Sequence, residues 1–409
     1  MPAITNCRIC GGQSFETVVD LGRQALTGIF PQTYDPNTFP AGALRLIRCT
    51  AVNGCGLVQL DSSFAPSTMY GDGYGYRSGL NSSMVQHLNH RVQKIKERAN
   101  LEPGDIVVDI GSNDGTSLGF YSSDLLRIGI DPTADKFRRY YPQGAVVVPN
   151  FFSSGLVLDA SNGKRAKAIS AFSMMYDLEN PVQFVKEVAA VLAADGIWVF
   201  EQSYLPLMLE QVAFDTICHE HIEYYGLRQI DWLLASAGLE AIDVELNNVN
   251  GGSFAVTAAH VGAFEISARV TDQRTKEQIL WDNASTVFAE FAEATETAAL
   301  ALSNFLTEQL AAGKTVAALG ASTKGNVLLQ YTQLNSNHIS VIGDVNPDKF
   351  GCVTPGSQIP IIPEEEALSG NFDYYLVLPW HFRDFFLNSE TFKGRKLVFP
   401  LPALEIIQR

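Results

Sequence analysis

Short buried strands alternate with turns and helices along the middle of this 409-residue chain. Runs rich in Val, Ile and Ala predict the strands, and apolar residues at helical spacing predict helices over 82–100 and 181–192. Such alternation is typical of a parallel sheet that is covered by helices, so the chain is expected to be an α/β protein. The strands are expected at 106–110, 127–131, 145–148, 168–172 and 196–200.

The turn after the first of these strands is rich in glycine. Asp109 is followed by Gly111 and Gly115, and a helix is expected after them. The spacing differs from the G-x-G-x-x-G of nicotinamide enzymes, and the lysine of a P-loop is missing. Asp131 ends the next strand, where a carboxylate can accept hydrogen bonds from both hydroxyls of a ribose. This corner of the sheet is therefore expected to bind an anionic ligand that contains ribose.

Four of the six cysteines lie within the first 55 residues. Cys7 and Cys10 form a C-x-x-C pair before two glycines, whereas five residues separate Cys49 from Cys55. Two such pairs can close a tetrahedral zinc site, which would be structural because no coordination position stays open. The alternative is a small β-rich module with four reduced, buried cysteines. Zinc is favoured because modules below about 70 residues seldom fold without a bound metal or disulfides.

A second group of reactive side chains lies between residues 214 and 225. Two histidines, two glutamates and two tyrosines occur within seven positions. His219 and His221 are two residues apart, a spacing that argues against the H-E-x-x-H site of zinc proteases. The segment follows the strand at 196–200, so it is expected at the carboxyl edge of the sheet, where ligands bind. Proton transfer is the expected chemistry, and a surface cluster without a catalytic role is the alternative.

The last part of the chain repeats the strand–turn–helix pattern. A predicted strand at 315–319 leads into Gly320-Ala-Ser-Thr-Lys-Gly-Asn326 and a predicted helix. Backbone amides, two hydroxyls and one lysine at a helix N-terminus can hold a phosphate. The alternative is a Rossmann-like lid with a structural role. Further elements are expected as strands at 339–343 and 373–378 and as a long linking helix within 277–310.

The balance of charge excludes some classes of partner. The chain has 29 Lys and Arg against 44 Asp and Glu, which gives a formal net charge of −15. Nucleic acids and anionic membranes attract clustered positive charge, so neither is an expected partner. The sequence contains no run of 18 apolar residues and does not begin like a signal peptide. We expect a cytoplasmic enzyme whose cysteines stay reduced.

The stretch from Asp109 to Asp131 resembles the class I S-adenosylmethionine-dependent methyltransferases, with another Rossmann-like nucleotide binder as the alternative. The resemblance implies that S-adenosylmethionine is the cofactor. Gly111, Ser112 and Asn113 would pass close to the methionine part of the cofactor, and Asp131 would hold its ribose. The residues implied at the adenine are Asn150 and Phe151.

The whole chain resembles the three-part bacterial sugar C-methyltransferases that act on nucleotide-linked deoxysugars. The matching stretches are 7–10, 48–59, 74–78, 109–115, 220–221, 251–252 and 320–326. The resemblance implies a class I methyltransferase Rossmann-like core, a small N-terminal zinc-binding module and a second Rossmann-like domain at the C-terminus. The implied boundaries are 1–70 for the zinc-binding module, 71–260 for the methyltransferase core, 261–310 for linking helices and 311–409 for the nucleotide-sugar-binding domain.

The same resemblance implies methyl transfer to a carbon, C3, of a nucleotide-linked 4-keto-deoxysugar. Loss of the C3 proton gives an enolate, and a histidine suits that proton abstraction at neutral pH. His221 would be the base and Glu220 would orient it. Tyr224, Tyr225 or His219 would donate a hydrogen bond to the enolate oxygen. The other implied contacts are Tyr76 and Ser78 at the methionine carboxylate, and Asn250, Gly252, Ser322, Thr323, Lys324, Asn326 and Lys349 at the substrate.

Two positions depart from the family pattern. Cys218 stands where members can carry a tyrosine ahead of the Glu-His pair, and Asn250 stands where they can carry a histidine before the paired glycines. Methylation of an oxygen or nitrogen of another small molecule is therefore the alternative reaction. A non-catalytic nucleotide-sugar binder is a third hypothesis, which the dense His/Glu/Tyr segment disfavours. A chain with these three parts could close its own active site and act as a monomer.

Overall fold

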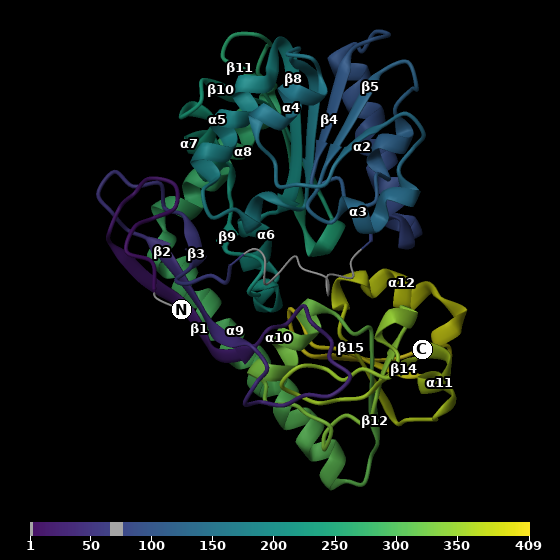
Figure 1. Ribbon diagram of the computed structural model, residues 1–409. Helices are drawn as coiled ribbons and strands as arrows, with labels where there is room; N and C mark the ends of the chain where they lie inside the picture. The colour runs from purple at the N-terminus through teal and green to yellow at the C-terminus, as the bar shows by residue number, and fades with distance from the viewer. Residues whose placement is uncertain (1–2, 66–76) are drawn as a thin grey trace.

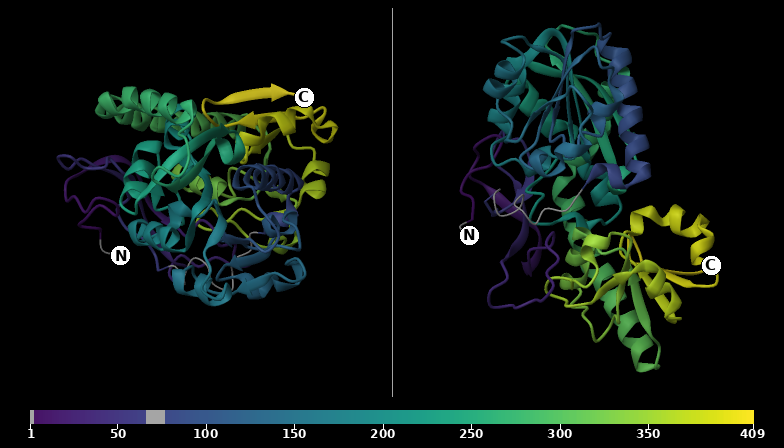
Figure 2. Two further views of the ribbon diagram at one scale, coloured as in Figure 1. Left: turned by 90° about the horizontal axis from the view of Figure 1, so that it is seen from above. Right: turned by 45° about the vertical axis from the view of Figure 1, so that its right-hand side comes forward.

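The computed structural model describes residues 3–65 and 77–409, which are organised around three sheets. Figure 1 shows a seven-stranded sheet in the upper lobe, a six-stranded sheet in the lower lobe and an N-terminal module at the side. Figure 2 shows the two lobes stacked, with the C-terminus in the lower one. The predicted α/β class, with two Rossmann-like halves and a small N-terminal module, is confirmed.

The N-terminal module is a four-stranded antiparallel sheet with the order β1-β2-β3-β9. Its fourth strand comes from the segment that carries the histidines, since Tyr224 pairs with Val58 and Glu223 pairs with Gln59. The module therefore fixes one end of that segment. The strands are β1 Phe15–Ala25, β2 Ala41–Cys49, β3 Val58–Leu60 and β9 Glu223–Tyr224.

The core sheet has the order β10-β11-β8-β7-β4-β5-β6. Its strands are parallel except for β11, which is antiparallel to both neighbours. The five predicted strands correspond to β4 through β8, and β8 is longer than expected. The strands are β4 Ile106–Ile110, β5 Leu126–Ile130, β6 Val146–Val148, β7 Ala166–Phe172, β8 Leu192–Ser203, β10 Leu239–Asn247 and β11 Ser253–His260.

The first core helix, α2 Ser82–Ala99, matches its prediction because its apolar residues share one buried face. Asn81 caps its start by accepting a hydrogen bond from the Ser83 amide, and Asn100 ends it in a left-handed conformation. The other helices of the core are α3 Ala134–Phe137, α4 Ser154–Ala160, α5 Pro181–Val191, α6 Leu205–Glu210 and α7 Leu227–Ala235.

The prediction of a helix after Gly115 is wrong. Residues Ser117–Phe120 form only a short 3-10 helix, η2, and Tyr121 returns to an extended backbone. The next strand begins at Leu126. The few residues available between the glycine turn and that strand leave no length for an α-helix.

The linking segment contains two helices, α8 Ala268–Asp282 and α9 Ala284–Ala311, so the stretch 277–310, expected as one helix, is broken. The break falls at Asn283, whose backbone is not helical (φ −112°, ψ 18°) and whose amide side chain donates to the Ile279 carbonyl over 2.8 Å. Side chains of this type compete with the helix for backbone hydrogen bonds, which explains the break. Helix α9 packs on β1 and runs beside the N-terminal module into the lower lobe (Figure 1).

The C-terminal domain has the strand order β14-β13-β12-β15-β16-β17 and is parallel except for β17. Its predicted strands are present with small shifts of their ends. The strands are β12 Val316–Leu319, β13 Ile342–Asp344, β14 Ile361–Pro363, β15 Tyr374–Val377, β16 Lys396–Phe399 and β17 Glu405–Gln408. The helices are α10 Thr323–Tyr331, α11 Glu364–Ser369 and α12 Arg383–Asn388.

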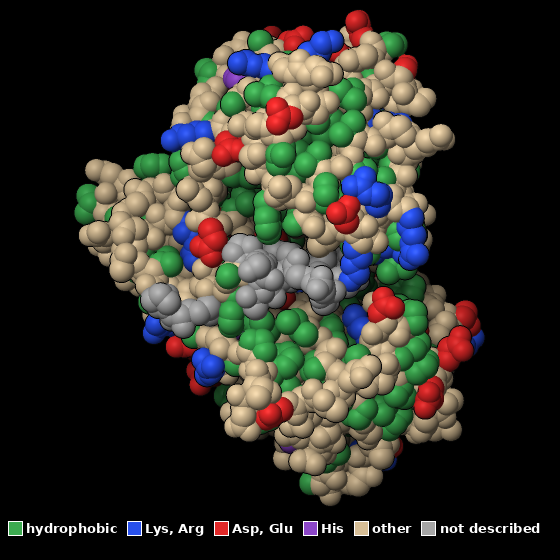
Figure 3. All heavy atoms as spheres, viewed as in Figure 1, with side chains coloured by type: hydrophobic (Ala, Val, Ile, Leu, Met, Phe, Trp, Pro, Cys, Tyr) green, Lys and Arg blue, Asp and Glu red, His purple; other side chains and the backbone are tan. Residues whose placement is uncertain are grey.

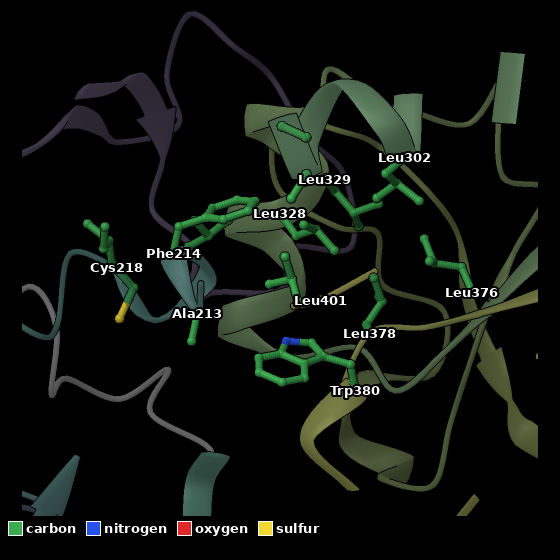
Figure 4. Close-up of a cluster of buried hydrophobic side chains, with 14 of the residues drawn as sticks. Ala213, Phe214, Cys218, Leu302, Leu328, Leu329, Leu376, Leu378, Trp380 and Leu401 are labelled. Atoms are coloured by element: carbon green, nitrogen blue, oxygen red, sulfur yellow. The ribbon is translucent and has the colours of Figure 1, made fainter. Parts of the chain in front are cut away.

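One hydrophobic core joins the N-terminal module to the C-terminal domain. Figure 4 shows the part of it where Phe214, from the 3-10 helix η5 Phe214–Thr216, lies with Leu328 and Leu329 of α10 and with Trp380. A second core fills the seven-stranded sheet and includes three of the N-terminal cysteines. The histidine segment is therefore held between all three parts of the chain.

The surface carries charges of both signs. On the face in Figure 3, Lys and Arg side chains are interspersed with Asp and Glu over both lobes. Even α9, with 28 residues, lacks the apolar length that a bilayer crossing needs, and so does every other described helix.

Candidate active site

The four N-terminal cysteines come together as predicted. Their sulfur atoms lie within 4.8 Å of one another, with 3.5 Å from Cys7 to Cys55 and 3.6 Å from Cys10 to Cys49. Tetrahedral zinc, with Zn–S bonds of about 2.3 Å, holds its sulfurs about 3.8 Å apart. The four thiols therefore fit one zinc ion and leave no position for a substrate, so the metal is structural.

Backbone glycines and a helix of the core both approach this cysteine cluster. A Cβ on Gly12 or Gly54 would come within 3.3 or 3.2 Å of the Cys49 sulfur, so both glycines permit the close approach. The Cys55 carbonyl accepts a hydrogen bond from the Gln229 side chain of α7 over 2.8 Å. The zinc cluster thus fastens the N-terminal module to the core.

The loop after β4 folds back on the end of β5. Gly111 and Asn113 adopt left-handed conformations (φ 69° and 50°), which allow the loop to turn sharply. The Gly111 amide donates to the Ile130 carbonyl over 2.8 Å, and the Asn113 amide donates to Asp131 Oδ2 over 2.9 Å. Gly111, Ser112, Asn113 and Asp131 are therefore neighbours at the carboxyl edge of the sheet.

The Asp131 carboxylate is buried and fixed at the end of β5. Its Oδ1 atom accepts hydrogen bonds from the Thr133 amide (2.7 Å) and the Thr133 hydroxyl (2.6 Å). A carboxylate has about four acceptor positions, so such an arrangement still allows ribose hydroxyls to bind. Tyr141, which the sequence does not single out, stiffens the loop because its hydroxyl bonds Ser112 Oγ and donates to the Asn113 carbonyl.

A segment upstream of α2 lies against the same loop. The Ser78 amide donates to Asn113 Oδ1 and the Gly79 amide donates to Asp114 Oδ2, each over 2.9 Å. Ser78 is thus beside the predicted cofactor corner, as the sequence implies. Tyr76 lies outside the described residues.

Three further residues of interest flank this corner. Asp109 is buried in β4 and accepts a hydrogen bond from Ser170 Oγ over 2.6 Å. Burial, with the nearby charges of Asp131 and Asp114, raises the pKa of Asp109 to about 7. Because Asp109 is buried in β4 and bonded to Ser170, its carboxyl has a structural role within the sheet. Asn150 and Phe151, the residues implied at the adenine, follow β6, and the Phe151 side chain is 51% exposed.

His221 is held by a backbone carbonyl. Its Nδ1 atom lies 3.3 Å from the Thr216 oxygen, which can only accept, so Nδ1 carries the proton and Nε2 is left as a base. The ring packs on Tyr176, with 4.1 Å between ring centroids. Burial, followed by the charge of Lys324, lowers the pKa of His221 to about 3. The imidazole is therefore neutral and has a fixed tautomer.

Glu220 faces the N-terminal module. Thr27 Oγ1 donates to its Oε2 over 3.5 Å, and a Cβ on Gly28 would lie only 2.0 Å from its Oε1. Burial raises the pKa of Glu220. His221 is oriented by the hydrogen bond that its Nδ1 donates to the Thr216 carbonyl. Sequence reasoning missed this contact because it involves a backbone atom.

Two of the other predicted catalytic residues lie in different places. The Tyr224 hydroxyl donates to the Thr216 carbonyl over 3.2 Å, so it shares this acceptor with His221. His219 instead lies 3.2 Å from the Gly42 carbonyl and packs edge-on against Phe64. Burial lowers the pKa of His219 to about 4. Tyr224 is therefore close to His221, whereas His219 belongs to the packing of the N-terminal module.

Lys324 connects the C-terminal domain to the core. Its Nζ atom donates to the Asn250 carbonyl over 2.6 Å, and Asn250 lies in the 3-10 helix η6 Val249–Gly251. Gly252 follows with φ 122°, and a Cβ there would lie 2.9 Å from the Leu207 side chain. Asn250, Gly252 and Lys324 thus meet at the junction of the two lobes.

The remaining predicted substrate residues surround the start of α10. Ser322 caps the helix by accepting from the Gly325 amide over 3.0 Å. Asn326 donates to the Thr27 carbonyl over 2.7 Å, and Lys349 donates to the Ala321 carbonyl over 2.6 Å. Three of these four side chains therefore hold the loop and its neighbours in place. Thr323 is the first residue of the helix.

Family models match three successive parts of the chain. They describe a zinc binding domain over residues 7–70, a methyltransferase domain over 84–244 and a C-methyltransferase C-terminal domain over 248–402. One relative matches along all three parts. C-methyltransferase NovU of Streptomyces niveus is 30% identical over 411 residues, which cover 99% of this chain and 97% of NovU.

Two solved methyltransferase structures each match less than half of this chain. An S-adenosylmethionine-dependent methyltransferase from Clostridium acetobutylicum is 12% identical with a TM-score of 0.35, over 44% of this chain and 92% of that chain. Magnesium protoporphyrin IX methyltransferase of Synechocystis is 14% identical with a TM-score of 0.34, over 47% of this chain and 88% of that chain. These TM-scores are too low to support a conclusion about the function of this chain.

The full-length relative, the matched methyltransferase domain and the cluster of four thiols agree with one another. S-adenosylmethionine is the cofactor that the core binds, and zinc is the ion that the N-terminal module binds. The chain belongs to the zinc-containing, S-adenosylmethionine-dependent C-methyltransferases.

Proposed function

We propose that the enzyme transfers the methyl group of S-adenosylmethionine to C3 of a nucleotide-linked 4-keto-deoxysugar. The observation that carries the proposal is the position of His221. Its neutral imidazole is fixed by the Thr216 carbonyl where the core, the N-terminal module and the C-terminal domain meet. Removal of a proton from carbon needs an unprotonated base in a fixed position, which this geometry supplies.

The proposed cofactor site is the loop between β4 and η2. Gly111, Ser112 and Asn113 contact the methionine part, and Asp131 accepts hydrogen bonds from the ribose hydroxyls. When bound, the cofactor supplies an electrophilic methyl group. The other proposed contacts are Tyr76 and Ser78 at the methionine carboxylate and Asn150 and Phe151 at the adenine.

The proposed substrate site spans the two lobes. Backbone amides at the start of α10, with the Thr323 hydroxyl, suit a diphosphate at a helix N-terminus. Helix α10 packs against η5, which carries the Thr216 carbonyl that holds His221. A nucleotide on the C-terminal domain would therefore extend its sugar toward the base. Ser322, Asn326 and Lys349 shape the nucleotide end, and Asn250 and Gly252 border the sugar.

The proposed mechanism begins with His221. Its Nε2 atom removes the C3 proton, the C–H electron pair forms a C3–C4 double bond, and the C4 oxygen becomes an oxyanion. The C3 carbon would then take the methyl group as the methyl–sulfur bond of the bound cofactor breaks and leaves a thioether. The C4 carbonyl re-forms, and the proton leaves His221 for solvent. Glu220 is proposed to shape the site beside His221. Of the two proposed donors, Tyr224 lies closer to the base than His219, because its hydroxyl bonds the Thr216 carbonyl that also holds His221. Its single proton would have to leave that carbonyl to reach the enolate oxygen. All of these groups belong to one chain, so a monomer suffices.

Mass spectrometry tests the proposal directly. The purified enzyme is incubated with S-adenosylmethionine and a panel of dTDP- and GDP-linked 4-keto-deoxysugars, and NMR locates the methyl group. We expect a gain of one methyl group on carbon. His221→Ala should lose about 1,000-fold in rate and still bind the cofactor. The control His90→Ala, at an exposed position of α2, should keep the wild-type rate.

Two outcomes would contradict the proposal. One is a product that carries its new methyl group on oxygen or nitrogen, which would establish the alternative acceptor. The other is the absence of any methylated sugar from a panel tested with cofactor-bound enzyme, which would remove 4-keto-deoxysugars as the substrate class.

A further inference from the structure

Lys324 occupies an unexpected position for a phosphate ligand. It lies in the first turn of α10, but its ammonium group reaches across to the core, where it donates to the Asn250 carbonyl over 2.6 Å. One carbonyl accepts one of its three protons, which leaves two for other acceptors. Gly251 adopts φ 88°, and the position that a Cβ would take there lies 3.8 Å from Lys324 Nζ, so the ammonium group also packs against this turn.

The surroundings of Lys324 contain polar atoms without partners. Asp215 is fully buried, and its Oδ2 atom accepts a hydrogen bond from Trp380 Nε1 over 2.8 Å. Within the described residues, its Oδ1 atom and the Nδ1 atom of His381 are buried and have no hydrogen-bond partner. Buried polar atoms are nearly always paired in native proteins, so this junction is organised to receive another polar molecule.

The same junction contains the proposed base. Helix α10 packs against η5, and η5 carries both Asp215 and the Thr216 carbonyl that orients His221. The charge of Lys324 contributes to lowering the pKa of both His221 and His381, and Asp215 counteracts the effect of burial on the pKa of Lys324. The Lys324 ammonium group and the His221 imidazole therefore both belong to the junction between α10 and η5.

We propose that Lys324 donates a hydrogen bond to the C4 oxygen of the sugar and stabilises the enolate that forms when His221 removes the C3 proton. This inference rests on the proposed function and makes Lys324 a catalytic residue. The proton moves from C3 to His221 Nε2, and the negative charge that develops on the C4 oxygen is balanced by the ammonium group. A cation fixed where charge develops is among the strongest contributions to catalysis.

Proton exchange separates this role from phosphate binding. Wild type, Lys324→Ala and the control Lys324→Arg are incubated in D2O with dTDP-4-keto-6-deoxyglucose, or with its GDP counterpart if the wild type prefers it. No methyl donor is added, and NMR measures deuterium entry at C3. Calorimetry measures the affinity for dTDP or GDP. The surface variant Lys314→Ala, whose partner is Asp373, controls for the loss of a lysine.

We expect Lys324→Ala to lower the saturated exchange rate at least about 100-fold and to change the nucleotide affinity less than about threefold. Methylammonium in the buffer should restore part of the exchange, because it can occupy the space that the side chain leaves. Lys324→Arg should retain more exchange than Lys324→Ala.

A saturated exchange rate within about threefold of wild type, together with at least a tenfold weaker nucleotide affinity, would make Lys324 a phosphate contact and overturn the inference. Failure of methylammonium to restore exchange in a folded Lys324→Ala enzyme would also count against it. Absence of exchange in the wild type with every sugar would instead contradict the proposed function itself.

Discussion

The proposed cofactor site around Gly111, Asn113 and Asp131 (the cofactor corner) is built differently from the proposed methyl-acceptor site. The latter, called the acceptor centre, surrounds Glu220 and His221. At the corner, the hydrogen bond from Asn113 to Asp131 joins residues 18 apart in sequence. At the acceptor centre, the bond from Thr27 to Glu220 spans 193 residues and the bond from Asn326 to Thr27 spans 299. The corner is thus a local device, whereas the centre exists only when all three parts of the chain are assembled.

Because of this difference, substitutions in the two regions should have different effects on ligand binding. A change within the corner should weaken cofactor binding and leave the nucleotide site intact. A change in the N-terminal module should disturb the acceptor centre and leave cofactor binding intact, because β9 and the loop that contains Thr27 and Gly28 both reach the histidine segment.

The largest effect is expected from loss of the zinc ion. Cys49→Ser should abolish zinc binding, lower the melting temperature by about 10 °C and reduce methyl transfer at least about 100-fold, because structural zinc contributes folding free energy. Metal analysis, thermal melting and product mass measure the three changes. Cys352→Ser removes a buried cysteine outside the cluster and should keep its zinc. Full turnover by zinc-free enzyme would show that the acceptor centre does not depend on the module.

A smaller and more selective effect is expected at the corner. Asp131→Ala should weaken S-adenosylmethionine binding about 10- to 100-fold, since hydrogen bonds to a charged group contribute about 1.5–3 kcal/mol. Affinity for dTDP or GDP should not change. Calorimetry with each ligand measures both, and the exposed Asp135→Ala is the matched control. Equal weakening of both ligands would mean that the corner and the nucleotide site are not independent.

The contact between Gly28 and Glu220 should be sensitive to a single methyl group. A Cβ there would lie 2.0 Å from Glu220 Oε1, so Gly28→Ala should displace the carboxylate and lower kcat about tenfold. The affinity for S-adenosylmethionine should stay within about twofold. Gly155→Ala, which has open space around its Cβ, is the control. A wild-type kcat in Gly28→Ala would show that Glu220 has no part in turnover.

The smallest effect is expected from pH. The pKa of His221 is lowered to about 3, so the imidazole stays unprotonated as pH falls from 8 to 6. The value of kcat/KM should therefore show no loss with an apparent pKa near 6.5, the ordinary value for histidine. Initial rates across this range measure it, with product mass as the readout. A loss of about tenfold per pH unit below 6.5 that disappears in His221→Asn would show that His221 titrates normally.

The fold could be predicted largely from local patterns. Strands β4 and β5 follow from their apolar runs, and α2 follows from its apolar spacing. The break of the linking helix at Asn283 and the short η2 depend on packing and on the length left for the chain, which no local pattern reveals. The cysteine cluster was predictable because thiol pairs have few other uses in a module of this size.

The acceptor centre was predictable only in part. His221 and Glu220 can be identified in the sequence as reactive side chains. The role of the Thr216 carbonyl cannot be predicted, because every residue has a backbone carbonyl. The approach of Gly28 to Glu220 and the reach of Lys324 to Asn250 depend on how distant segments pack. The sequence treats Lys324 and Ser322 as similar phosphate contacts, whereas the structure directs one across to the core and uses the other as a helix cap.

Deuterium exchange at C3 of the keto sugar tests the central claim most directly, because it reports the action of the base without the methyl donor. The account predicts that the wild type exchanges this hydrogen in D2O and that His221→Ala retains less than about 1% of the rate. An exchange rate in His221→Ala equal to that of the wild type would contradict the account, because another group would then be removing the proton.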